Sequence, residues 1–278
     1  MCAVSYLNTV PLVWGMQHGS GAGDGRGIFD LGFALPSECA RQLAAGEADI
    51  GIVPVIEMAR QELPYFPGCG IACHGPVRSI LLISKVPFEE IRTLATDAGS
   101  RTSVMLARII LAERFGAEPA LISRPADLAS MLGEADAALV IGDSALRIDP
   151  ATLPLETLDL GGEWTSLTGL PMVFALWAGR KEIVQERLAR AFAASMHYGL
   201  AHLDEIAARE SPLRGIPEDL AREYLTRHIV FELGERDYAG LDLFLEQASR
   251  FEKLPAAGGL PVTVRPVSAS PFTGEVTA

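Results

Sequence analysis

The stretch LPMVFALWA at residues 170–178 is an uninterrupted apolar run, which is typical of a buried strand. RSILLIS at 78–84 is an earlier strand of the same kind. Between the two, short apolar runs alternate with helical patterns, as they do from residue 3 onward, and this alternation predicts an α/β protein. We expect the chain to leave a first lobe after the strand ending near Ser84 and to return through the strand at 172–178. Two crossings would form a hinge beside a ligand cleft.

This pattern predicts two lobes, the first of which is formed by two separate segments of the chain. Residues 1–84 together with 175–254 form lobe 1, and residues 85–174 form lobe 2. Three helices between residue 181 and the early 250s would complete lobe 1. The tail at 255–278 is rich in Pro, Gly, Ser and Thr and is expected to be loosely ordered. The glycine-rich segment at 19–27 fits no dinucleotide-binding register and is interpreted as a linker.

The composition excludes several classes of protein. Of the 278 residues, 49% are hydrophobic and 21% charged, which is enough apolar material for packed cores. The formal charge of -12 argues against nucleic acid and against an anionic membrane surface as partners. The sequence contains no apolar run of ~18 residues and no Lys or Arg before Arg26, so we expect neither a membrane span nor a secretory signal. We therefore predict a cytoplasmic protein.

The segment Ser5-Tyr6-Leu7-Asn8-Thr9 follows the first predicted strand. Ligands of open α/β sheets bind beyond the carboxyl ends of strands, so these five residues are candidates for substrate binding. Asn8 offers one acceptor and two donors but cannot act as a base. The alternative is an ordinary turn whose side chains satisfy their own backbone.

Arg78 and Ser79 follow a Gly-Pro turn at 75–76, at the start of the strand predicted to run to Ser84. An arginine can hold a carboxylate through two parallel hydrogen bonds, which makes Arg78 a candidate ligand for an acidic substrate. A surface arginine beside a serine is the alternative.

The turn DAGSRTS at 97–103 is the strongest local signal, because it joins a strand to a helix predicted over 104–115. Free backbone N–H groups and the positive end of the helix dipole meet there. The side chains of Ser100, Arg101, Thr102 and Ser103 add donors. We interpret the turn as a site for a carboxylate or phosphate. Simple N-capping would account for one hydroxyl, but not for three and an arginine.

Two further groups of residues could carry chemistry. Cys69, Cys73 and His74 have a spacing that a metal could use, but no second ligand pair follows, and we predict no metal. Asp143 follows the strand predicted at 137–141. Its carboxylate could face the cleft, where it would touch substrate, or cap the next helix.

The chain resembles the chorismate dehydratase family of the futalosine route to menaquinone in six segments that occur in order: AVSYLNTVPL (3–12), ADIGIVPVIE (48–57), GPVRSILLISK (75–85), SRTSVMLARIIL (100–111), ALVIGDSAL (138–146) and WTSLTGLPMVFALWAG (164–179). The resemblance runs from about residue 2 to about residue 252.

The resemblance implies two α/β lobes of the type II periplasmic-binding-protein kind, and dehydration of chorismate, a dianion, to 3-[(1-carboxyvinyl)oxy]benzoate without a cofactor or metal. By motif, it places Asn8 and Ser79 as catalytic residues and the turn at 100–103 as a carboxylate site. Neither Asn8 nor Ser79 is basic enough to take the proton. We expect a substrate carboxylate to accept it, with Asp143 and His74 as alternative bases.

Two other functions remain open. One is the sister enzyme of the same route, which makes 1,4-dihydroxy-6-naphthoate and relies on a histidine base. The other is a non-catalytic binding protein for a small carboxylate. The sequence does not indicate an oligomeric state.

Overall fold

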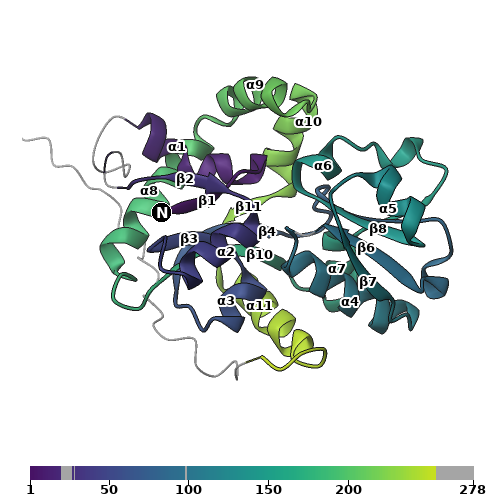
Figure 1. Ribbon diagram of the computed structural model, residues 1–278. Coiled ribbons are helices and arrows are strands. Elements are labelled where there is room, and N and C mark those ends of the chain that lie inside the picture. Colours follow the sequence, from purple (N-terminus) through teal and green to yellow (C-terminus); the bar gives the residue numbers. More distant parts are fainter. Residues whose placement is uncertain (20–26, 28, 98, 255–278) are drawn as a thin grey trace, which may run out of the picture.

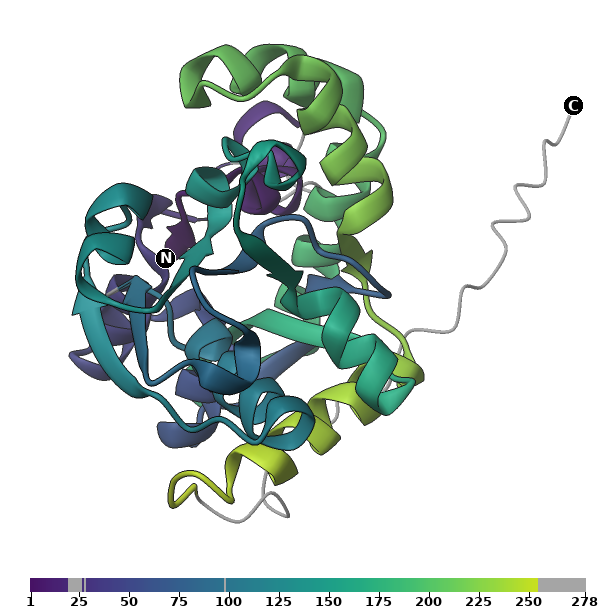
Figure 2. The ribbon, with the colours of Figure 1, turned by 90° about the vertical axis from the view of Figure 1, so that its right-hand side faces the viewer.

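The computed structural model describes residues 1–19, 27, 29–97 and 99–254. The tail predicted at 255–278, and all of the linker predicted at 19–27 except its two ends, lie outside the described residues. Two β-sheets with flanking helices organise the rest, which confirms the predicted α/β fold with two lobes. Figure 1 shows the two sheets side by side, and Figure 2 turns the smaller one toward the viewer.

The first sheet has six strands in the order β11-β4-β10-β3-β1-β2. β1 runs parallel to β2 and β3, whereas β10 is antiparallel to both β3 and β4. Its strands are β1 Cys2–Val4, β2 Gly32–Ala34, β3 Ile50–Pro54, β4 Tyr65–Cys73, β10 Met172–Gly179 and β11 Val230–Glu232. The α-helices from the same parts of the chain are α1 Val10–His18, α2 Pro36–Ala44, α3 Val55–Arg60, α8 Glu186–Leu200, α9 Leu203–Arg214, α10 Glu218–Glu223 and α11 Glu235–Ala248.

The second sheet has five strands in the order β7-β6-β8-β5-β9. β6 runs parallel to β7 and β8, and β5 is antiparallel to β8 and β9. The strands are β5 Ile80–Ser84, β6 Thr93–Asp97, β7 Ala120–Arg124, β8 Ala137–Ile141 and β9 Glu156–Asp159. The helices are α4 Thr102–Phe115, α5 Leu128–Glu134, α6 Gly142–Leu146 and α7 Leu160–Thr168. Single turns at η1 Leu7–Thr9, η3 Phe88–Glu90 and η4 Pro150–Thr152 are 3₁₀, and η5 Tyr224–His228 is a π-helix.

The predicted lobe boundaries are wrong at both crossings. β5 pairs with β8 and β9, so the strand ending at Ser84 belongs to the second sheet, and the chain crosses in the loop between β4 and β5. All of β10, from Met172 on, belongs to the first sheet. Both strands are fully buried, and an apolar run of this kind predicts a strand without indicating its neighbours. Between residues 181 and 254 the structure has four α-helices, not three.

A cluster of aromatic rings fixes α8 against the first sheet. The Trp177 ring of β10 stacks on Phe192 of α8 with centroids 4.8 Å apart, and Phe66 of β4 meets Phe192 edge-on at the same distance. Each of the three side chains is fully buried, which contributes roughly 1.5–3 kcal/mol for a side chain of this kind.

Helix α8 also packs closely against α1, the helix that follows the SYLNT segment. Gly15 of α1 faces the backbone of Ser195, and Gly199 of α8 faces the Pro11 carbonyl. The Ser195 hydroxyl donates to the Leu12 carbonyl at 2.8 Å. This contact holds the start of α1, and with it the end of β1, in a fixed place.

We expect Gly199→Ala to destabilise the protein by about 1–3 kcal/mol, because overpacking forces the backbone to shift. A Cβ there would lie 2.0 Å from the Pro11 oxygen. Chemical denaturation measures the change. Gly133→Ala in α5 is the matched control, since a Cβ at that position meets nothing within 4 Å. Equal loss of stability in both variants would contradict the close α1–α8 contact.

Candidate active site

A cavity lies where the carboxyl ends of β1, β6 and β8 meet the loop between β4 and β5. It contains about 570 Å³ of empty space, part of it open to solvent. Both sheets contribute to its wall, and so do the helix starts that follow β6 and β8. The lining residues are Val4, Tyr6, Asn8, Pro36, Pro54, Ile71, Val77, Ser79, Ile80, Ser100, Arg101, Thr102, Ser103, Ile141, Gly142, Phe174 and Ala175.

Asn8 and Ser79 are joined through a third side chain, Tyr224. The Asn8 Nδ2 donates to the Tyr224 hydroxyl at 3.0 Å, and that hydroxyl donates to the Ser79 Oγ at 2.9 Å. Burial raises the pKa of Tyr224, so its hydroxyl stays protonated at neutral pH. The Asn8 Oδ1 is buried without a partner among the described residues.

The end of the cavity at the start of α4 is suited to an anion. The Ser100 hydroxyl is buried and has no partner among the described residues, which costs about 1–3 kcal/mol unless a ligand supplies one. The Arg101 side chain is half exposed, and its nearest carboxylate, Glu57, is 4.0 Å away. Ser103 lies in the first turn of the 14-residue helix, whose N-terminus favours negative charge.

Thr102 lines the cavity, but its hydroxyl is already bound. It donates to the Phe174 carbonyl of β10 at 3.2 Å and accepts from the Ile56 N–H at 3.4 Å. Both partners belong to the first lobe, whereas Thr102 begins a helix of the second. Its hydroxyl therefore holds the two lobes together, and the prediction that it donates to substrate does not fit this arrangement.

Arg78 is also occupied elsewhere. Its backbone has φ 65°, in the left-handed region that L-residues rarely adopt. The backbone N–H groups of Val77 and Arg78 both donate to the Asp159 carboxylate. The Arg78 guanidinium donates to the carbonyls of Ala145 and Ile148 at 3.1 and 2.6 Å. Arg78 does not line the cavity. The prediction that it holds a substrate carboxylate is not supported, because the strained turn aims its side chain at the end of α6.

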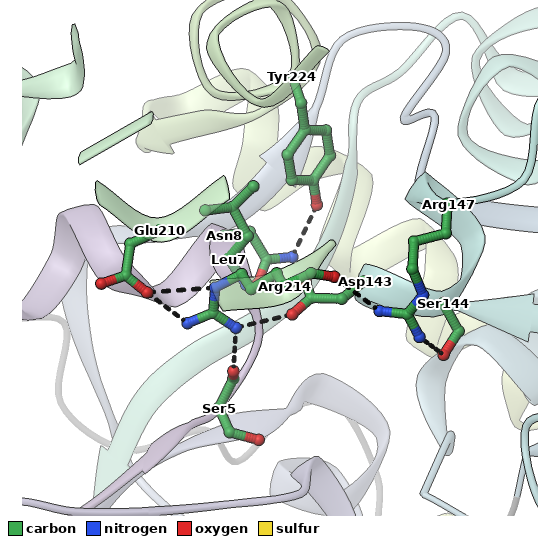
Figure 3. Close-up of polar contacts among 9 residues, drawn as sticks. All are labelled: Ser5, Leu7, Asn8, Asp143, Ser144, Arg147, Glu210, Arg214 and Tyr224. Atoms are coloured by element: carbon green, nitrogen blue, oxygen red, sulfur yellow. Dashed lines mark hydrogen bonds and ion pairs between the residues drawn. The ribbon is translucent and has the colours of Figure 1, made fainter. Parts of the chain in front are cut away.

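Asp143 forms a bridge between the lobes (Figure 3). Its Oδ1 accepts from the Leu7 N–H at 2.9 Å, and its Oδ2 accepts from Arg214 at 2.7 Å. Arg214 also donates to the Ser5 carbonyl at 2.7 Å and pairs with Glu210 at 2.9 Å. Asp143, Ser5 and Leu7 are absent from the cavity lining. They position Tyr6 and Asn8 through the backbone, which corrects their predicted contact with substrate.

Tyr6 lies in the wall between the two lobes. A Cβ at Gly142, whose φ is 59°, would come within 2.9 Å of the Tyr6 ring, so the ring packs closely against the start of α6. Burial, together with the charges of Asp97 and Asp143, raises the pKa of Tyr6. The phenol is thus a neutral group at physiological pH.

The lining residues of this cavity include no carboxylate and no histidine. Asp143 is paired as described above. His74 lies outside the lining, with its Nε2 2.8 Å from Oδ1 of Asp237, which caps α11. Both alternative bases are therefore placed away from the cavity wall.

No group of three or more His, Cys, Asp or Glu that could hold a metal occurs among the described residues. Cys69 and Cys73 are buried free thiols, and burial raises their pKa to about 12. Among the described helices, none has the length and apolarity needed to cross a bilayer.

A second hollow of about 780 Å³ adjoins the cavity at Ser100 and Arg101. Arg60 and Arg108 lie in its wall, together with the acidic Asp97 and Glu252. Arg60 is paired with Glu57 and Glu252. The Arg108 guanidinium lies 5.0 Å over the Phe251 ring. Of the arginines in this wall, Arg60 is thus neutralised by its partners, and Arg101 and Arg108 carry the positive charge near the cavity.

Tyr224 is the site residue that sequence reasoning missed. It lies 216 residues from Asn8 and 145 from Ser79 in the chain. The sequence around it, AREYLTRHIV, is typical of an ordinary helix end, and no motif in it indicates a π-helix.

A two-lobe α/β fold with a cavity between its sheets is typical of proteins that bind small molecules. Solved structures share the fold. A protein of Archaeoglobus fulgidus matches with a TM-score of 0.71 and 19% identity, over 90% of this chain and 96% of its own. The periplasmic aliphatic sulphonate binding protein SsuA of Escherichia coli matches with a TM-score of 0.58 and 16% identity, over 90% and 85%. These identities show the fold alone.

Sequence comparison goes further. The model of the menaquinone biosynthesis family matches residues 1–250. The chorismate dehydratase of Thermus thermophilus is 31% identical over an alignment of 231 residues that covers 77% of this chain and 84% of that protein. The chain belongs to the menaquinone biosynthesis family, and the resemblance found in the sequence is confirmed.

We expect Arg101→Gln to weaken binding of isophthalate, an aromatic dicarboxylate used as probe, by about tenfold, the loss of one charge-assisted hydrogen bond. Isothermal titration calorimetry measures the affinity. Arg190→Gln is the matched control, because it removes the same charge from an exposed position on α8. Equal effects of the two substitutions would mean that only net charge matters and that the α4 terminus is not the anion site.

Proposed function

We propose that this chain is a chorismate dehydratase, a hydro-lyase that converts chorismate to 3-[(1-carboxyvinyl)oxy]benzoate for menaquinone synthesis by the futalosine route. Family membership and the dehydratase of Thermus thermophilus support the activity. The observation that carries the proposal is the character of the cavity wall: one arginine and a helix N-terminus at one end, neutral hydroxyl and amide groups at the other, and no acidic or imidazole base among its lining residues.

This distribution suits a substrate that carries two carboxylates and reacts by losing a hydroxyl. One carboxylate binds at Ser100, Arg101 and Ser103, where a guanidinium and free N–H groups supply charge-assisted hydrogen bonds. The reacting part lies toward Asn8 and Ser79. As a biosynthetic enzyme acting on a charged metabolite, the protein would work in the cytoplasm.

The reaction breaks the C3–H and C4–OH bonds of the ring. The C3 proton is acidified because the C1 carboxylate is conjugated with the ring. We propose that the carboxylate of the enolpyruvyl arm takes this proton. The electron pair of the C–H bond becomes a ring double bond as hydroxide leaves C4, and the proton and the hydroxide together make up the water lost. Asn8 and Ser79 hold the reacting groups and stabilise the departing oxygen by hydrogen bonding.

The two rival functions differ in what they require of the cavity. The sister enzyme relies on a histidine base, and no histidine lines this cavity. A non-catalytic binding protein is compatible with the fold, since SsuA shares it. Turnover separates that rival from the enzyme.

We expect the purified protein to convert chorismate into a product one water lighter. Liquid chromatography with mass spectrometry detects the product, and the Ser79→Ala variant is the control for spontaneous loss of water. Chorismate that binds and is recovered unchanged would favour the non-catalytic binding protein.

We expect Asp143→Asn and His74→Gln to retain turnover within about tenfold, because neither side chain lines the cavity. The asparagine keeps an acceptor for the Leu7 N–H and loses only the charge that pairs with Arg214. Steady-state kinetics gives the comparison. Complete loss of turnover in Asp143→Asn, with chorismate binding intact, would contradict the expectation that this carboxylate takes no direct part in the reaction.

A further inference from the structure

We propose that Tyr224 is a positioning residue that sets the hydrogen-bond polarity of Asn8 and Ser79, so that together they recognise the substrate's alcohol group. The proposal rests on the proposed function and adds to it a residue and a specificity. It is based on two hydrogen bonds, from Asn8 to Tyr224 and from Tyr224 to Ser79, which form a row Asn8–Tyr224–Ser79. Figure 3 shows the first of these bonds.

A phenol has one hydrogen to donate, and in this row of contacts the Tyr224 hydroxyl donates it to Ser79. The Tyr224 oxygen accepts from the Asn8 amide and gives its own hydrogen to the Ser79 Oγ. Because the Ser79 Oγ accepts from Tyr224, the hydrogen of the Ser79 hydroxyl is free to point into the cavity that Ser79 lines. Because the Asn8 amide nitrogen is bound to Tyr224, the Asn8 Oδ1 is left as a buried acceptor without a partner among the described residues.

Asn8 and Ser79 both line the cavity, so the pair would offer a ligand there one acceptor and one donor. A carboxylate only accepts and a cation only donates, but an alcohol does both. The pair thus selects a hydroxyl group, whereas Ser100 and Arg101 at the other end select a carboxylate. In the proposed reaction, the hydroxyl is the group that leaves, and the Ser79 O–H stabilises it as it departs.

Local structure holds Tyr224 in this role. It is 1% exposed and begins the π-helix at 224–228, a form of helix often found at functional sites. From the same π-helix, His228 Nδ1 donates to the Pro76 carbonyl at 2.9 Å. The Ser79 carbonyl accepts from the Gly142 N–H at 2.8 Å. The segment 76–79 is thus fixed from both lobes, and burial keeps the phenol protonated so that it can donate.

The first test is kinetic and uses Tyr224→Phe, which keeps the ring and removes the hydroxyl. We expect kcat for chorismate to fall about 10- to 100-fold, with KM changed less than about threefold, since the loss affects orientation in the transition state. The double variant Ser79→Ala/Tyr224→Phe should be no slower than Ser79→Ala alone. Tyr238→Phe is the matched control. It removes the hydroxyl of another tyrosine, which accepts from the Gly68 N–H at 2.8 Å and is absent from the cavity lining, and turnover should be unchanged.

The second test measures binding without turnover. The probes are 3-[(1-carboxyvinyl)oxy]benzoate and its 4-hydroxy derivative, titrated by calorimetry. We expect the wild type to bind the hydroxylated probe about fivefold or more tightly, and both Tyr224→Phe and Ser79→Ala to bind the two probes alike. Retained affinity for the plain benzoate shows that each variant is folded.

Wild-type turnover in Tyr224→Phe, or full preference for the hydroxylated probe in both variants, overturns the proposal. Multiplicative effects in the double variant also overturn it, because Tyr224 would then act independently of Ser79. A wild type that prefers the hydroxylated probe but does not convert chorismate contradicts the dehydratase function and leaves the positioning role of Tyr224 standing.

Discussion

The carboxylate of Asp143 joins the two lobes at the point on which the site depends. It lies on α6 of the second lobe, and its two oxygens reach the Leu7 N–H and Arg214 of the first (Figure 3). Each bond fixes a part of the first lobe: the backbone between Tyr6 and Asn8, and the end of α9. Both charges are largely shielded from solvent. Without Arg214 the Asp143 carboxylate would be poorly compensated, whereas Arg214 also has Glu210 as a partner. This bridge and the Thr102–Phe174 bond both join the two lobes close to the cavity.

The net charge of -12 is compatible with a dianionic ligand because the charges are segregated. Acidic side chains lie outside the cavity lining, which carries Arg101 and the start of α4. A carboxylate in that wall would repel the ligand and would itself lose hydration on closure. The exterior field slows the approach of an anion at low salt, while the short-range donors inside decide what is held.

The sequence predicts much of this arrangement, since the carboxyl ends of strands are where ligands bind in open α/β sheets. Asn8 and the 100–103 turn both follow parallel strands, and both line the cavity. Arg78 does not, because a positive φ turns its side chain toward α6. Neither a residue's φ nor the partner of a buried strand can be inferred from composition, which is why β5 was assigned to the other lobe. Tyr224 meets Asn8 and Ser79 only through the tertiary fold.

The proposed substrate-assisted proton transfer is consistent with the same segregation of charge. A protein base beside the C3 proton would be a buried carboxylate or imidazole near a dianion. A carboxylate there would be protonated by repulsion and desolvation, and an imidazole would be drawn into a permanent ion pair. The enolpyruvyl carboxylate avoids both problems, because it enters with the substrate and its charge is already part of what the cavity binds. The protein then has to supply orientation, to which neutral groups such as Asn8, Ser79 and Tyr224 are suited, since their hydrogen bonds do not change with pH near neutrality.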